Sequence, residues 1–206
     1  MGLVFVLPIL RSLLSTPVSK RQWGLFGLRG FFHAGGVILW FYAMTRLPIA
    51  EVTAMNYLAP IYVTVGAAIF LGEKLAARRI VAVCLGLAGA AIILRPGFRE
   101  VSTGHLAMLL AAVVFAGSYL LAKVLADEAR PVMIVTMLSI FVTIGLAPFA
   151  FTVWITPTAQ ELLILAGVAF FATAGHFTMT LAFAAAPVTV TQPVTFLQLV
   201  WATALG

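Results

Sequence analysis

The sequence predicts an all-α, polytopic transmembrane helix bundle, and three observations support this fold class. Hydrophobic residues make up 63% of the 206 residues and charged residues only 9%, against roughly 25% charged residues in an ordinary soluble domain. The run from Leu162 to Gly206 contains no charged residue and is more than twice the roughly 20 residues that cross a bilayer. An apolar helix between Leu47 and Leu75 carries one thin polar stripe that recurs near the end of the sequence.

The apolar segments follow one another with short connections, and none shows the alternating pattern of an outer-membrane barrel. The first has no basic residues before it and contains Pro8, which indicates the last half of a span and not a signal peptide. Pro96-Gly97 ends the fourth segment, and Pro187 divides the long final run because proline cannot donate a backbone hydrogen bond. The predicted segments are Met1–Leu10, Gly30–Leu47, Ile49–Leu71, Ile80–Leu94, Leu106–Ala122, Pro131–Ile155, Leu162–Ala185 and Val188–Gly206.

The basic residues gather in alternate connections, which predicts the orientation of the chain in its membrane. Connections 11–29, 72–79 and 123–130 hold most of the lysines and arginines, whereas the opposite side holds only Arg46, Arg95 and Arg99. The positive-inside rule places the first set in the cytoplasm. We therefore expect a multi-pass protein of the bacterial inner membrane, and the net charge of +6 indicates topology and not a nucleic-acid partner. The single cysteine, Cys84, excludes an intrachain disulfide.

A comparison of the sequence with itself indicates two similar halves. A shift of 139 positions brings five identical residue pairs together, among them Pro48 with Pro187 and Thr64 with Thr203. The alternative is a chance similarity between alanine-rich helices. The shift predicts repeats over residues 1–97 and 104–206, and leaves the equivalents of a first and a last helix outside the sequence. We therefore expect a fragment of a ten-helix protein, truncated at both ends.

Three stretches resemble the EamA-type members of the drug/metabolite transporter superfamily. They are WFYAMTRLPIAEVTAMNYLAPIYVTVGAAIFLGEKL (40–75), RRIVAVCLGLAGAAIILRPG (78–97) and GHFTMTLAFAAAPVTVTQPVTFLQLVWATALG (175–206). The resemblance implies ten helices in two inverted five-helix repeats, a central substrate cavity and transport by alternating access. On that scheme the segments of this chain are helices two to nine, and Glu73 is a glutamate that recurs in the family.

Polar residues inside apolar segments are the candidate functional residues, since they are costly unless they face protein or water. The two matching stripes and nearby aromatic rings predict a cavity wall, although interhelical hydrogen bonding explains each residue as well. His176, near the middle of its span, is a second kind of candidate, with His33 a weaker one. Pro60 and Pro193 free backbone carbonyls within the stripes. The cavity candidates are Trp40, Thr53, Asn56, Tyr57, Thr64, His176, Gln192, Thr195 and Gln198.

Glu51 is the carboxylate within an apolar segment, and two roles fit it. In the first turn of its helix it would interact with the helix dipole, or it would exchange protons and couple transport to an ion gradient. Glu73 lies at the cytoplasmic end of the same segment, where it would pair with Lys74, Arg78 or Arg79.

The leading hypothesis is a secondary transporter of a small metabolite or drug-like solute. Amino acids, vitamins such as riboflavin, nucleoside derivatives and cationic drugs all suit a cavity of amides, hydroxyls and rings. An enzyme is the weaker alternative, because no zinc-protease motif, nucleophile elbow or phosphate-binding loop occurs. We expect no cofactor and no metal. The expected partners are the lipid bilayer, a small solute and a second copy in a homodimer, and a non-transporting or regulatory membrane fragment is the other alternative.

Overall fold

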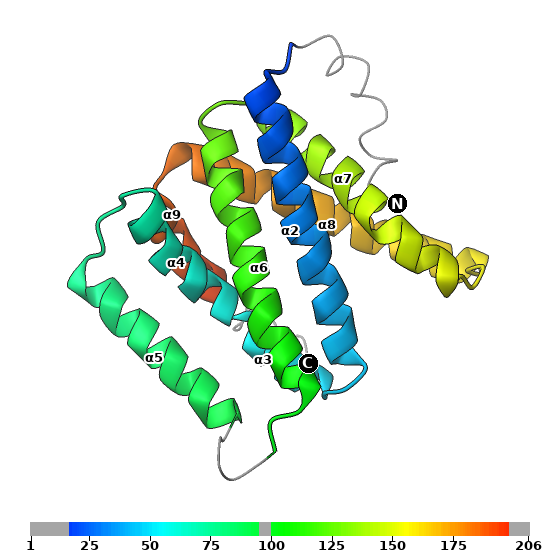
Figure 1. Ribbon diagram of the computed structural model, residues 1–206, viewed down its shortest axis with the longest axis horizontal. Helices are drawn as coiled ribbons and strands as arrows, with labels where there is room; N and C mark the ends of the chain where they lie inside the picture. Colours follow the sequence, from blue (N-terminus) through cyan, green and yellow to red (C-terminus); the bar gives the residue numbers. More distant parts are fainter. Residues whose placement is uncertain (1–16, 95–99, 198–206) are drawn as a thin grey trace. The chain divides into compact units, whose positions relative to one another are not determined.

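The computed structural model describes residues 17–94 and 100–197, and every regular element in these ranges is helical (Figure 1). The predicted all-α class is therefore confirmed. The predicted segment Met1–Leu10, the end of the last segment, and Gln198 lie outside the described residues. The elements are α2 (Lys20–Met44), α3 (Ile49–Asn56), α4 (Leu58–Phe70), α5 (Ala77–Leu94), α6 (Thr103–Ala126), α7 (Pro131–Thr152), α8 (Ala159–Ala185), α9 (Val188–Thr191) and the 3-10 helix η1 (Gln192–Phe196).

Helices long and apolar enough to cross a membrane make this a multi-pass membrane protein. Five such helices lie in the described part of the chain. Four are α2, α6, α7 and α8, and the fifth is formed by α3 and α4 together. Helix α5 contains a shorter apolar stretch, Ile80–Gly89.

Helix α2 begins at Lys20, ten residues before the start predicted at Gly30, so the prediction of a loop over 11–29 is wrong from Lys20 onward. The helix starts at a capping box. The Gln22 N–H donates to Ser19 Oγ (3.2 Å), and the Ser19 N–H donates to Gln22 Oε1 (3.0 Å). This reciprocal pair satisfies two N–H groups that a helix end otherwise leaves open. The basic residues of the predicted loop, Lys20, Arg21 and Arg29, therefore lie on a helix.

The segment Ile49–Leu71, predicted as one helix, is interrupted at Tyr57 between α3 and α4. Pro60 is the physical reason, because it has no N–H to donate to the Asn56 carbonyl and its ring crowds that carbonyl. The second proline has a comparable effect. The predicted helix from Val188 is α helical for only four residues and continues past Pro193 as the 3-10 helix η1.

The chain forms two compact units, and each is described by itself. The first comprises residues 1–34 and 121–185. Its core is Phe26 of α2 with Leu125, Met133, Ile134 and Met137, and α7 packs against α8. Helices α2 and α7 approach closely, since a Cβ at Gly30 would overlap the Cβ of Phe141 and one at Gly145 would lie 2.8 Å from that of Ala34.

The second unit comprises residues 35–120 and 186–206. Two clusters form its core, one centred on Leu58, Ile61 and Phe115, the other on Val52, Met55 and Met108. Helix α4 contacts α5, α9 and η1, and α3 contacts α5. Each compact unit takes segments from both halves of the sequence, so the repeats over 1–97 and 104–206 stay a prediction about sequence.

Candidate functional site

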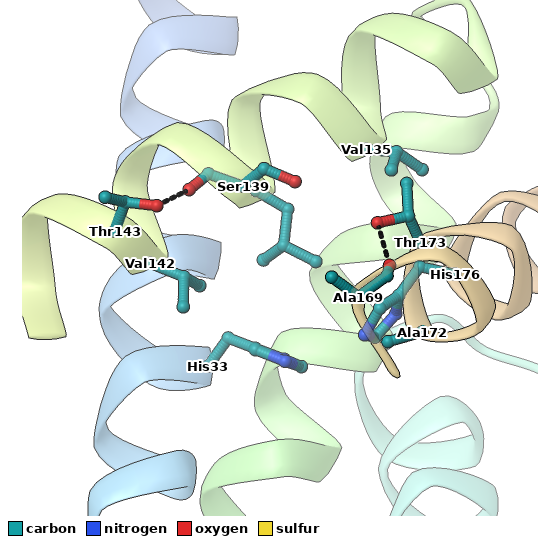
Figure 2. A pocket seen from close by; sticks show the side chains of 10 residues that line it. His33, Val135, Ser139, Val142, Thr143, Ala169, Ala172, Thr173 and His176 are labelled. Carbon is teal, nitrogen blue, oxygen red and sulfur yellow. Dashed lines mark hydrogen bonds between the residues drawn. The ribbon is translucent and has the colours of Figure 1, made fainter. Parts of the chain in front are cut away.

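A cavity of about 210 Å³ lies within the first unit, among α2, α7 and α8. Its wall is mostly apolar, with two histidines and three hydroxyl side chains as its polar groups (Figure 2). The lining residues are His33, Val135, Leu138, Ser139, Val142, Thr143, Ala169, Ala172, Thr173 and His176. An apolar cavity with a few converging polar groups is the usual form of a small-molecule site.

The two histidines of the cavity come from different helices and meet edge to face. His33 is a buried residue of α2, and His176 belongs to α8. Their ring centroids are 5.1 Å apart, with an angle of 75° between the planes, and Figure 2 shows the rings directed toward each other. Among the described residues, the buried Nδ1 of His176 has no hydrogen-bond partner. Such a group costs about 1–3 kcal/mol of stability unless something in the cavity bonds to it.

The hydroxyl groups of the cavity offer acceptors to a solute. Thr173 Oγ1 donates to the Ala169 carbonyl and Thr143 Oγ1 donates to the Ser139 carbonyl, each at 2.7 Å. Each of these two hydroxyl groups donates its only proton to a carbonyl of its own helix. The lone pairs of its oxygen can therefore accept a hydrogen bond from a solute. The hydroxyl wall therefore favours a solute that donates hydrogen bonds.

Arg29 is a fully buried cation one helical turn before His33. It is 1% exposed, and its Nη1 donates to the Ile134 carbonyl of α7 (3.1 Å). Its guanidinium thus ties α2 to α7, the helices that carry two walls of the cavity.

A second polar group is buried in the other unit, around Glu51. Its Oε1 lies 2.9 Å from Nε2 of His105, and the two side chains are 8% and 2% exposed. The other ring nitrogen, Nδ1, accepts the Ser102 backbone N–H (3.1 Å) and lies 2.8 Å from Ser102 Oγ. Glu51 therefore has a buried side-chain partner 54 residues away in the sequence.

The predicted cavity candidates are divided between the two units. His176 lies in the cavity of the first unit, whereas the others that the structure describes belong to the second. Thr53 and Thr64 donate to the carbonyls of Ile49 and Pro60 on their own helices (2.8 Å each), and Thr195 to that of Gln192 (2.6 Å). Asn56 is exposed, Trp40 and Tyr57 are half-buried, and Gln192 is buried.

Several residues of these sites did not stand out in the sequence. Among them, Ser102 and His105 carried a signal, because Ser-x-x-His ahead of an apolar run resembles a capping box with histidine in place of glutamate or glutamine. Ser139, Thr143 and Thr173 carried none, since hydroxyl residues are frequent in apolar helices.

Glu73 holds the start of α9. Its two carboxylate oxygens accept the backbone N–H groups of Val188 and Thr189, each at 2.9 Å. Gly72, at a φ of 67°, takes the left-handed conformation that turns the chain after α4 and brings Glu73 to this position.

Comparison with known proteins identifies relatives along most of the chain. The model of the EamA-like transporter family matches residues 1–95. A riboflavin transporter of Rhizobium johnstonii is 32% identical over 95% of this chain and 65% of its own length. A riboflavin transporter of Brucella anthropi is 30% identical over 75% of this chain and 53% of its own length. An S-adenosylmethionine uptake transporter of Rickettsia bellii is 27% identical over 84% and 60%.

The chain spans between about half and two thirds of the length of the curated relatives it matches. No solved structure matches it significantly. The family match and the named relatives agree with the resemblance carried by the stretches at 40–75, 78–97 and 175–206. The chain is similar to the EamA-like transporter family over residues 1–95 and to metabolite transporters over most of its length.

Proposed function

We propose that the protein moves a small metabolite across the membrane by alternating access between two inverted repeats. The observation that carries this proposal is the similarity to transporters over 75–95% of the chain. The buried polar groups of the membrane helices support it, because such groups mark solute pathways in membrane proteins. No covalent chemistry is part of the proposal.

The proposed solute is a planar heteroaromatic compound that also donates hydrogen bonds. Riboflavin and S-adenosylmethionine, the substrates in the names of the relatives, both combine a heteroaromatic ring system with hydroxyl groups, which lie on a ribityl chain in riboflavin and on ribose in S-adenosylmethionine. The edge-to-face imidazoles of His33 and His176 suit contact with a ring. The hydroxyl oxygens of Thr143 and Thr173 suit a polyhydroxyl chain. The sequence-predicted candidates in α3, α4 and η1 are proposed to line another part of the path.

Flux of labelled riboflavin and S-adenosylmethionine into proteoliposomes that hold the purified chain tests the proposal. We expect saturable counterflow of one of them, inhibited by an excess of the same unlabelled compound. The His176→Phe variant, which keeps an aromatic ring and removes both nitrogens, should reduce this flux. Folded protein without saturable flux of any compound in a metabolite panel would contradict the proposal.

The orientation and assembly of the chain are part of the proposal. We place the protein in the bacterial inner membrane with its basic connections in the cytoplasm. In support, Arg21 at the start of α2 pairs with Glu128 of the connection between α6 and α7, so these ends lie on one side. The chain is further proposed to form a homodimer, which chemical crosslinking in native membranes tests.

A further inference from the structure

The second unit contains a buried acid–imidazole pair whose protonation state follows from its contacts. The Ser102 backbone N–H donates to His105 Nδ1 (3.1 Å), so Nδ1 holds a lone pair and the ring is not doubly protonated. A neutral ring then carries its proton on Nε2, which points at the Glu51 carboxylate, 2.9 Å away. The pair in this state is a neutral imidazole that donates to a carboxylate, with a net charge of −1.

The pair joins two helices at their first turns. Ser102 precedes α6, and His105 is its third residue, so the imidazole accepts the cap N–H as glutamine or glutamate does in a capping box. Glu51 is the third residue of α3. Thr53 and Asn56, two of the proposed solute contacts, follow on that helix. Whatever changes the pair therefore changes both the cap of α6 and the attachment of α3.

We propose that Glu51 and His105 form a proton-binding site, and that its occupancy gives solute transport its pH dependence by weakening either the cap of α6 or the tie between α6 and α3. Transport itself rests on the proposed function above. One proton neutralises the pair, and it has two places to bind. On Nδ1 it takes the acceptor away from the Ser102 N–H. On the carboxylate it removes the charge that the Nε2–H group faces. Each place weakens one of the two hydrogen bonds, so the first turn of α6 loses its cap or its tie to α3.

The described residues of the second unit carry other groups that exchange protons or bear charge. Among the described side chains of this unit, the other titratable or charged ones are Tyr42, Arg46, Tyr57, Tyr62, Glu73, Lys74, Cys84, Glu100 and Tyr119. Tyr42 donates to Thr103 Oγ1 (3.0 Å), and the Arg46 guanidinium lies 5.1 Å from the Tyr42 ring centre. Of these groups, Glu100 is the carboxylate nearest to His105 in the sequence, and it is exposed. It therefore serves as the matched control.

The test compares three variants of the full chain in lipid nanodiscs between about pH 5 and pH 8, the range in which histidine changes its charge. H105Q keeps a cap acceptor without titrating, E51Q keeps the hydrogen-bonding shape without the charge, and E100Q removes a nearby exposed charge. We expect the melting temperature of the unaltered chain to shift across this range by about 2–4 °C, the size for one lost interaction in a chain of this length. H105Q and E51Q should lose this shift, and E100Q should keep it.

An unchanged shift in both E51Q and H105Q would overturn the proton site, and H105N replaces H105Q if the latter does not fold. Counterflow of the solute at the two ends of this pH range is the second readout. Flux that responds to pH in the unaltered chain but not in E51Q supports coupling, whereas equal responses in both overturn it. Failure of the proposed function has a different signature, because no flux would then occur at any pH while the melting temperatures still decide whether the site binds a proton.

Discussion

The three histidines of the chain occupy two kinds of environment, and the contacts of each nitrogen separate them. Both ring nitrogens of His105 have partners, so its orientation and tautomer are fixed by the fold. The Nδ1 of His176 is buried beside a cavity without a partner in the described structure. A buried ring nitrogen without a hydrogen-bond partner favours a ligand-binding role. A ring whose two nitrogens both have hydrogen-bond partners favours a structural or proton-binding role.

The tautomer of His105 is the first prediction. Because Nδ1 accepts the Ser102 N–H, we expect the neutral ring to carry its proton on Nε2 at neutral pH. Nitrogen NMR of the chain with ¹⁵N-labelled histidine measures this directly, and the signals that vanish in H105Q assign the ring. A proton found on Nδ1 at neutral pH would contradict the structure of the pair.

The second prediction is that a substitution at His176 raises the stability of the protein and lowers its affinity for the solute. His176→Phe replaces a buried nitrogen that lacks a partner with an apolar ring of similar size. We expect the free energy of unfolding to rise by up to about 1–3 kcal/mol, while binding of riboflavin or S-adenosylmethionine falls at least tenfold. Thermal unfolding and equilibrium binding measure the two effects. Thr178→Ala, at an exposed position of the same helix, should leave binding unchanged. Undiminished binding by the phenylalanine variant would remove His176 from the site.

At the scale of the elements, the ends of helices depend on particular side chains. Glu73 accepts hydrogen bonds from two N–H groups at the start of α9. This helix follows Pro187 and is only four residues long, so it has few hydrogen bonds of its own. Hydrogen bonds from helix N-terminal N–H groups to a charged acceptor are stronger than those to a neutral one. The short helix therefore depends on a residue that reaches it from the end of α4.

The third prediction concerns this cap. Glu73→Ala should lower the free energy of unfolding by about 0.5–2 kcal/mol, the usual cost of losing a helix cap. Glu73→Gln keeps one acceptor oxygen and should lose less. Thermal unfolding of both variants in the same lipid shows which of the two is less stable. A glutamine variant that is less stable than the alanine variant would show that the hydrogen bonds to α9 are not what Glu73 contributes.

The elements differ in how far the sequence could predict them. Long apolar runs predicted α6, α7 and α8 to within a few residues, because crossing a membrane requires about 20 such residues. The start of α2 was missed although Ser19 and Gln22 form a capping box, since the basic residues around it resembled a loop. The break at Tyr57 was missed because a proline such as Pro60 kinks some helices and ends others, and the sequence does not distinguish the two outcomes. The pairing of Glu51 with His105 has no local signal, since it depends on how helices far apart in the sequence pack.

At the scale of the whole molecule, each helix that spans the membrane puts the connections before and after it on opposite sides. Helix α7 has 22 residues, or about 33 Å at 1.5 Å each, enough to cross the roughly 30 Å of hydrocarbon. Asp127 precedes it and Thr156 follows it, and both are exposed. A membrane-spanning α7 therefore puts these two residues on opposite sides. On the orientation proposed above, the positive-inside rule assigns the end near Asp127, with its basic residues, to the cytoplasm.

The fourth prediction tests this orientation. In a chain whose only cysteine is first removed by Cys84→Ser, Asp127→Cys and Thr156→Cys supply one reactive thiol each. A membrane-impermeant maleimide should label the Thr156→Cys variant in spheroplasts and the Asp127→Cys variant in inside-out vesicles. Labelling of both from one side would mean that α7 does not cross the membrane. The reverse pattern would keep the span but invert the chain, and Arg21, which pairs with Glu128 beside the first site, would then face the periplasm against the positive-inside rule.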